Sequence, residues 1–188
     1  MTALATAPFR IDYGPSATMD AATLVADLRA GIRGDVIAPG DPGYDAARAI
    51  RNLGFDRRPA AIVRPLDGID VARAIVGARS AGFDLAVKGG GHSIAGHSVI
   101  DDGVVIDLAR MRDIAIDPDA RIAWVGGGAT AGEVTAAAHE HGLAVPFGDT
   151  ASVGIGGLTL GGGVGYLARK HGLTIDNLVA VELVTADG

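Results

Sequence analysis

Cysteine is absent from the 188 residues of this chain, which excludes disulfides, thiolate metal sites and a cysteine nucleophile. A reducing compartment suits that composition, so we expect a cytoplasmic protein. No apolar run approaches the roughly 18 residues needed to cross a bilayer. Residues 1–20 also lack the basic and then apolar stretches of a secretory signal. We therefore expect no membrane partner.

Aromatic residues are scarce, at 4% of the chain, and like charges do not form runs. The formal net charge is −6, whereas nucleic-acid binding needs a basic face and usually stacking rings. Nucleic acid is thus not an expected partner. With 48% hydrophobic and 20% charged residues, the composition is that of a globular protein.

Glycine is abundant, with 29 residues gathered in a few clusters rather than at a fixed period. Such clusters are typical of backbone that must approach a ligand closely, so several loops are predicted to surround one. The dinucleotide pattern G-x-G-x-x-G starts at Gly154 and Gly156 but has Thr159 in place of its third glycine. The P-loop pattern is absent as well. NAD on a Rossmann fold and ATP on a P-loop are therefore disfavoured.

The clearest structural unit begins at Ala60. Residues 60–63 form an apolar run typical of a strand, and Asp70 is predicted to cap a helix that ends at Gly82. A second strand over 85–87 leads directly into the loop KGGGHS at 88–93. This is a βαβ unit with a glycine-rich loop at the carboxyl end of its second strand, where open α/β folds bind ligands.

Weaker patterns predict the remaining elements. They are a short helix carrying Leu24, Val25, Leu28 and Ile32, a turn at 40–43, a short helix or loop over 44–53, strands over 104–108, 121–125 and 179–184, and a helix that begins with a Thr130–Glu133 capping box and ends at Gly142. Trp124 is expected in the core or between subdomains, and His139 and His141 in solvent. Asp187-Gly188 is typical of a hairpin turn whose returning strand is missing, so we expect an incomplete structure.

His92 directly follows three glycines, on a loop with few side chains to cover it. A lone loop histidine is usually a hydrogen-bonded structural residue. Here close backbone approach and a nucleophilic imidazole favour covalent attachment of a flavin. His92 and His97 lack i, i+4 spacing and have no carboxylate before Asp101, so no metal is expected. No serine–histidine–aspartate arrangement has support.

Five segments together resemble a known family. They are RPAAIVRP (58–65), VKGGGHSIAGHS (87–98), VVIDLARM (104–111), GLAVPFGDTASVGIGGLTLGGGVGYLARKHGL (142–173) and DNLVAVELVTADG (176–188). Over about residues 40–188 the chain is similar to bacterial FAD-linked oxidases of the berberine-bridge-enzyme-like group, in the vanillyl-alcohol-oxidase superfamily. The resemblance implies an α+β fold, a PCMH-type FAD-binding domain of two α+β subdomains that is incomplete at its C-terminus. The expected division is an N-terminal extension (1–40), a first subdomain (41–110) and a truncated second subdomain (111–188).

The resemblance also implies the cofactor site. His92 would carry FAD covalently, the loop 89–93 would wrap the pyrophosphate, and Leu183 would lie near the adenosine. The full set of implied cofactor-binding residues is Lys88, Gly89, Gly90, Gly91, His92, Ser93, Gly96, His97, Ser98, Gly148, Thr150, Val153, Gly154, Gly156, Gly157, Leu160, Tyr166 and Leu183.

Three positions refine this expectation. Thr150 occupies the place where many relatives attach the flavin a second time through cysteine, so a single histidyl link is predicted. Lys88 replaces a common arginine, which keeps the charge and loses the planar fork. Val153 has the small side chain of the oxidase version at the position thought to control oxygen access.

The implied activity is that of a flavin-dependent oxidoreductase. A base outside this chain would take a proton from a small hydroxyl or amine substrate, hydride would pass to flavin N5, and oxygen would be the acceptor. Relatives continue well beyond residue 188, so we expect a fragment: a truncated chain, a proteolytic product or half of a split protein, completed by a further segment or a second chain. The alternatives are a flavin-binding module without catalysis of its own, and a noncovalent dehydrogenase, which His92 disfavours.

Overall fold

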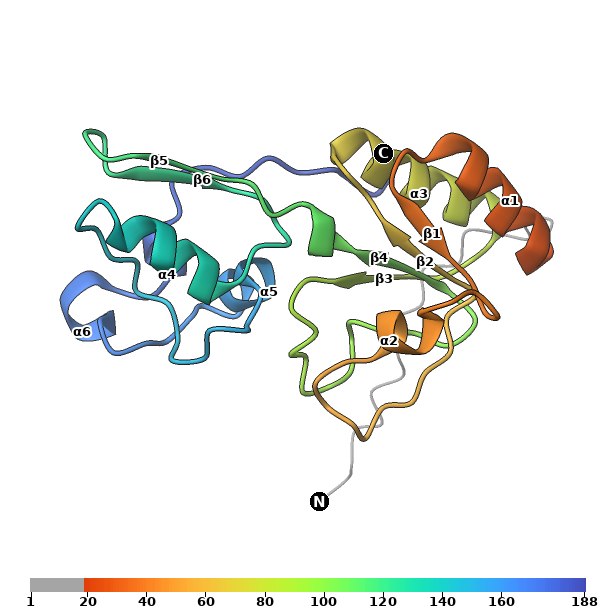
Figure 1. Ribbon diagram of the computed structural model, residues 1–188, viewed down its shortest axis with the longest axis horizontal. Helices are drawn as coiled ribbons and strands as arrows, with labels where there is room; N and C mark the ends of the chain where they lie inside the picture. Colours follow the sequence, from red (N-terminus) through yellow and green to blue (C-terminus); the bar gives the residue numbers. More distant parts are fainter. Residues whose placement is uncertain (1–18) are drawn as a thin grey trace, which may run out of the picture.

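The computed structural model describes residues 19–188, so the predicted lack of a secretory signal in residues 1–20 falls almost wholly outside it. Figure 1 shows two lobes joined side by side. The first lobe, residues 19–110, contains a four-stranded sheet, and the second lobe, residues 111–177, contains a two-stranded one. Within residues 19–188, no helix has the length and apolarity needed to cross a membrane.

The sheet of the first lobe has the order β1-β2-β4-β3. Its strands are β1 (Asp35–Ile37), β2 (Ala61–Arg64), β3 (Leu85–Lys88) and β4 (Val104–Asp107). β1 is antiparallel to β2, while β2, β4 and β3 are parallel to one another. The predicted βαβ unit is confirmed, with β4 inserted between its two strands. Three carboxyl ends therefore share one sheet edge.

Helices cover both faces of this sheet. α1 (Ala21–Gly31) and α3 (Gly68–Ala81) pack on one face, and α2 (Tyr44–Arg48) lies on the other, with a 3-10 turn η1 (Leu108–Arg110) after β4. Side chains of β2 alternate between the two apolar clusters, Val63 facing α1 and α3 and Ile62 facing α2. Tyr44 donates its hydroxyl to the Pro59 carbonyl at 2.7 Å, and burial raises the pKa of Tyr44.

The start of α3 differs from the prediction. Asp67, not Asp70, caps the helix, and its carboxylate accepts from the N–H groups of the first turn. Asp70 is fully buried and accepts from the backbone N–H groups of Arg33, Gly34 and Leu66 at 3.0–3.1 Å. The prediction was wrong because Asp70 lies on the inward face of the helix, where it ties the loop after α1 to α3.

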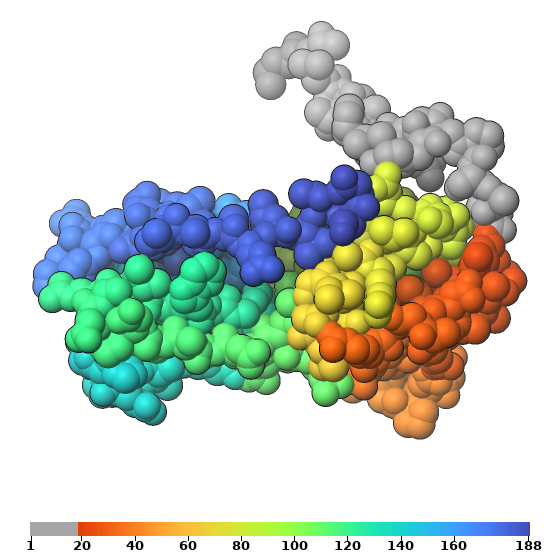
Figure 2. All heavy atoms as spheres, turned by 90° about the horizontal axis from the view of Figure 1, so that it is seen from above, coloured from red at the N-terminus to blue at the C-terminus, as the bar shows by residue number. Residues whose placement is uncertain are grey.

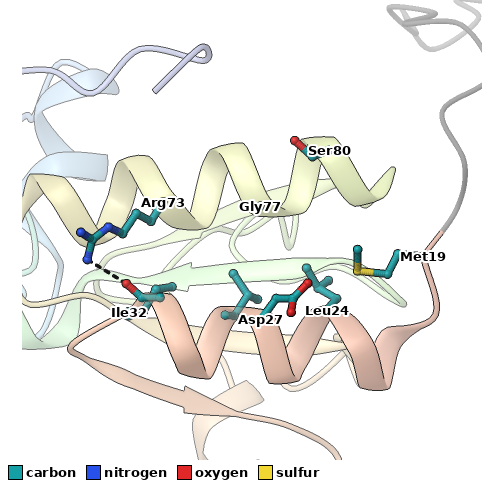
Figure 3. A pocket seen from close by; sticks show the side chains of 9 residues that line it. Met19, Leu24, Asp27, Ile32, Arg73, Gly77 and Ser80 are labelled. Atoms are coloured by element: carbon teal, nitrogen blue, oxygen red, sulfur yellow. Dashed lines mark hydrogen bonds between the residues drawn. The ribbon is translucent and has the colours of Figure 1, made fainter.

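Figure 3 shows the pocket between α1 and α3, a cavity of about 160 Å³. Arg73 reaches across from α3 and donates to the carbonyl of Gly31 at 2.8 Å. Leu24 and Leu28 line the cavity from α1. None of the predicted cofactor residues borders this pocket, so it belongs to the packing of the two helices.

The second lobe is built on a hairpin of β5 (Ile114–Asp117) and β6 (Ile122–Val125), and sequence reasoning had missed β5. α4 (Ala131–His139) packs against it, followed by α5 (Ile155–Leu160), α6 (Ala168–His171) and a 3-10 turn η2 (Ile175–Asn177). The predicted capping box of Thr130 and Glu133 is confirmed. His139 and His141 are exposed, as expected.

Of the two places expected for Trp124, the core is wrong. Trp124 is 63% exposed and stands opposite Ala115 on the outer face of the hairpin. Ile114 and Ile116, on the other face of β5, are half-buried. An apolar strand pattern indicates that a face can be covered, and it does not indicate which neighbour covers it.

The C-terminal segment, residues 178–188, contains no strand, so the strand predicted over 179–184 is wrong for this structure. Val179 and Leu183 are 80% and 72% exposed, and no described residue pairs with this stretch as a neighbouring strand. Figure 2 shows the segment (dark blue) returning from the second lobe to α3 (yellow). There Val184 packs over Gly68, and Arg79 donates to the carbonyl of Ala186.

Candidate functional site

Two glycine-rich loops cross where the two lobes meet. One follows β3, and the other leads into α5. A Cβ atom placed on Gly90 would lie only 2.3 Å from the backbone nitrogen of Gly154 and 2.9 Å from the carbonyl oxygen of Ser152. A Cβ on Gly154 would lie equally close, 2.3 Å, to the nitrogen of Gly90. The two backbones are in direct contact, which only glycine permits at both positions.

The start of α4 holds the second of these loops in place. The N–H of Ala131 donates to the Val153 carbonyl at 2.8 Å, and that of Gly132 to the Ala151 carbonyl at 2.9 Å. The capping box orients this first turn, since the N–H of Thr130 donates to the Glu133 carboxylate at 2.9 Å. The first turn of α4, which the sequence predicts from local signals, thus fixes the position of the loop where it contacts Gly90.

The third glycine cluster, residues 126–128, joins the same crossing. The carbonyl oxygen of Gly127 is 3.8 Å from a Cβ built on Gly89 and 3.4 Å from one built on Gly156. The expectation that the glycine clusters form one site agrees with this arrangement. Loops from both lobes contribute to it.

The first loop presents several free amide groups in succession. Among residues 19–188, none accepts a hydrogen bond from the N–H of Gly90, Gly91, His92 or Ser93. Gly91 has φ +69°, the left-handed conformation that turns successive N–H groups toward one side. Such a row of amides forms an anion-binding concavity. The loop therefore suits a pyrophosphate such as that of FAD.

A buried hydroxyl gives a second test of fit. Ser98 is 7% exposed, and within the described part of the chain its Oγ is the buried side-chain polar atom that lacks a hydrogen-bond partner. An unsatisfied buried hydroxyl costs about 1–3 kcal/mol, so a ligand partner is the natural explanation. Nearby, Gly96 packs under the ring of Phe55, and the His97 N–H donates to Ser93 Oγ at 3.1 Å. Residues 89–98 thus present polar groups, the free amides and the Ser98 hydroxyl, that suit a polar ligand.

His92 lies at the crossing itself. Its Nε2 is 3.0 Å from Oγ of Ser152, which belongs to the other loop. Sequence reasoning had singled out His92 but not Ser152. Ser152, directly before Val153 and Gly154, has no sequence signal of its own, since the contact joins residues 60 positions apart.

Lys88 lies beneath the glycine loop. Its Nζ donates to the Ala47 carbonyl at 2.7 Å and is 3.6 Å from Oδ2 of Asp107. Asp107 is only 1% exposed and also accepts from Nε of Arg64 at 3.1 Å. These charges occupy the carboxyl ends of β2, β4 and β3. Sequence reasoning missed Asp107, although an acid that ends a buried apolar strand was an available signal.

The other predicted cofactor residues lie further along the second lobe and the C-terminal segment. Thr150 is exposed and donates its hydroxyl to Asp149 at 3.1 Å. Leu160 and Tyr166 are 86% and 88% exposed, and Leu183 is 72% exposed. Gly148 borders a groove between α4 and its own loop. The structure does not bring these side chains onto the crossing, and their assignment to the cofactor stays a prediction.

Comparison with known proteins decides the family. Residues 59–188 match the family described as FAD binding domain. The chain belongs to this family. Its resemblance to the berberine-bridge-enzyme-like group is confirmed, since a relative of that group from Nicotiana tabacum, berberine bridge enzyme-like D-2, is 38% identical over 152 residues, 74% of this chain and 26% of the relative.

Other relatives are FAD-linked oxidoreductases. (R)-6-hydroxynicotine oxidase of Paenarthrobacter nicotinovorans is 41% identical over 84% of this chain and 34% of its own length. The crystal structure of 6-hydroxy-D-nicotine oxidase from Arthrobacter nicotinovorans has a TM-score of 0.82 at 40% identity, covering 83% of this chain and 34% of that one. A BBE-like 1 variant of Physcomitrella patens has a TM-score of 0.84 at 34% identity, covering 88% and 36%.

These neighbours confirm the expected α+β fold of PCMH-type FAD-binding domains and support an oxidoreductase at the level of the family. The chain spans about a third of the length of the relatives it matches. FAD is accordingly the cofactor of this domain, and the free amides of residues 90–93 and the buried hydroxyl of Ser98 fit it.

Proposed function

We propose that this chain holds FAD for an oxidase and attaches it through one covalent bond to His92. The observation that carries the proposal is the position of His92 where the two glycine loops cross, with its ring held by Ser152 at 3.0 Å. A half-buried imidazole beside a row of free amides is suited to a cofactor that is bound by its pyrophosphate and bonded at its ring. Because the chain has no cysteine, a second, thioether link is excluded.

The residues of this chain bind and orient, while FAD, when bound, supplies the two-electron redox chemistry. The N–H groups of Gly90 to Ser93 would hold the pyrophosphate, and Ser98 would give or accept one further hydrogen bond. Gly90 and Gly154 leave room for no side chain at the crossing. The binding site is therefore built from backbone, with His92 as its reactive side chain.

The proposed reaction is the oxidation of a small hydroxyl or amine substrate with oxygen as acceptor. Half-buried Val153, hydrogen-bonded to Ala131, has the small side chain that suits access of oxygen. A base and a substrate pocket would come from a further segment or a second chain, and the exposed Trp124 and Val179 support such a contact. The isolated chain is then expected to bind FAD without turnover. A cytoplasmic location is proposed on the lack of cysteine.

A flavin-binding module without catalysis of its own is the second candidate. It rests on the large apolar side chains that the second lobe leaves exposed, Leu160 and Tyr166 among them, which suit docking as one subunit of an assembly. The two candidates differ in one result. Addition of the complementary polypeptide would give substrate-dependent hydrogen peroxide only if the first candidate is right.

The test is the intact mass of the purified chain after acid denaturation in the presence of FAD. We expect a mass higher by one FAD, and His92→Ala should return the mass to that of the polypeptide while leaving noncovalent FAD binding measurable. His139→Ala, an exposed histidine at the end of α4, is the matched control and should keep the bound flavin. Flavin that survives denaturation in His92→Ala would exclude His92 as the attachment site.

A further inference from the structure

The imidazole of His92 has different surroundings at its two nitrogens. Nε2 is 3.0 Å from Ser152 Oγ, whereas Nδ1 has no hydrogen-bond partner among residues 19–188. A neutral imidazole carries its proton on one nitrogen and its nucleophilic lone pair on the other. The partner of one nitrogen therefore decides which nitrogen can react.

Ser152 is held more firmly than a usual loop residue. Its two neighbours, Ala151 and Val153, each accept a hydrogen bond from the first turn of α4, at 2.9 and 2.8 Å. Its own carbonyl oxygen would lie 2.9 Å from a Cβ on Gly90, so the loop carrying His92 abuts it. With the backbone constrained on both sides, Oγ of Ser152 meets the ring of His92 from a defined direction.

We propose that Ser152 is the positioning residue for flavin attachment, which it assists by accepting the Nε2 proton of His92 in a hydrogen bond and so leaving the lone pair on Nδ1. This inference rests on the proposed covalent link through His92. The same contact restrains rotation of the ring, because Ser152 and His92 belong to different loops that are in contact at this crossing. A hydrogen bond to the second nitrogen of a reactive histidine commonly sets both tautomer and orientation.

Covalent attachment would exchange one C–H bond and one N–H bond for one C–N bond, with dioxygen as the oxidant. A bond forms between Nδ1 of His92 and the 8α-methyl carbon of the flavin, and one C–H bond of that methyl group breaks. The Nε2 proton leaves past Ser152, so the ring ends neutral. The two protons released, together with the two electrons left on the flavin, would reduce dioxygen to hydrogen peroxide and leave the flavin oxidised.

The experiment compares Ser152→Ala with the wild-type chain. Apoprotein is mixed with FAD in air, total bound FAD is measured by absorbance, and attached FAD by intact mass after acid denaturation over time. We expect Ser152→Ala to bind FAD normally but attach it about tenfold more slowly, the change that loss of one side-chain hydrogen bond supports. Ser152→Thr keeps the hydroxyl and should restore the rate. Ser80→Ala, at the far end of α3, is the control.

A second readout separates positioning from mere support of the loop. Nitrogen-15 chemical shifts of the His92 ring in the apoprotein should show one tautomer, protonated at Nε2, in the wild type and a mixture in Ser152→Ala. Attachment at the wild-type rate in Ser152→Ala, or equal loss of bound and attached FAD, would overturn the role of Ser152. Failure of the wild type to attach bound FAD would instead overturn the proposed function, with the tautomer measurement still deciding whether Ser152 sets the ring.

Discussion

In the first lobe, parallel strands lie between helices on both faces, and large aliphatic side chains such as Ile62 and Ile106 are 0% and 1% exposed. In the second lobe, a hairpin packs against one helix, and its buried side chains are mostly small, as Ala131 and Ala138 show. Burial of aliphatic surface is the main favourable contribution to folding, so the two lobes are stabilised by different means. The first has a core of its own, and the second depends on backbone hydrogen bonds and close glycine contacts.

The candidate site draws on both lobes. His92 follows a strand of the lobe with the full core, while Ser152 belongs to the lobe with little aliphatic burial. A ligand that bridges these loops would stabilise the second lobe by binding its folded form. Binding of FAD and the order of the second lobe should accordingly be coupled.

The largest effect is expected at the buried charges of the first lobe. Asp107→Ala leaves Lys88, whose side chain is 12% exposed, without its nearby carboxylate. Breaking a buried pair in this way costs about 3–5 kcal/mol, measured as free energy of unfolding in urea. Asp107→Asn, which keeps an acceptor for the Ala109 N–H, separates lost charge from lost hydrogen bonding. A loss below about 1 kcal/mol would mean that the charges at this sheet edge are hydrated and that the core ends before them.

A pair of truncations compares the lobes directly. Ile62→Ala, in the core between the sheet and α2, should cost about 3 kcal/mol, within the range for buried aliphatic residues. Leu160→Ala removes a side chain that is 86% exposed and should change stability by less than about 0.5 kcal/mol. Both values come from the same urea titrations. Equal losses would show that Leu160 is covered in solution, and the contrast between the lobes would fail.

An effect smaller than that of Ile62→Ala is expected at the capping box of α4. Thr130→Ala removes a side chain that caps the helix and should cost about 1 kcal/mol. Because α4 also holds the loop of Ser152, hydrogen exchange should quicken in the amides of α4 and of residues 151–155, with α3 unchanged. Equal acceleration in α3 would indicate that both lobes unfold as one unit, contrary to the comparison.

Elements with local signals were predicted well. The capping box of Thr130 and Glu133 lies within one turn, and the βαβ unit with its glycine loop lies within one stretch of chain. The residue patterns that define these elements are therefore visible in a short part of the sequence. Predictions failed where a distant partner decides the outcome. Asp70 was assigned to a cap because only its neighbours in sequence were visible, whereas its carboxylate binds the loop 33–34.

The sequence by itself determined the family, the capping box at the start of α4 and the position of His92 after three glycines, because each depends on residue type and short spacing. Only the tertiary structure decided that Ser152 faces His92, that Asp107 pairs with Lys88, and that residues 179–184 lie unpaired. Hydrogen bonds and ion pairs act over a few ångströms of space, whatever the separation along the chain. A strand likewise requires a partner to pair with, which its own alternating pattern cannot supply.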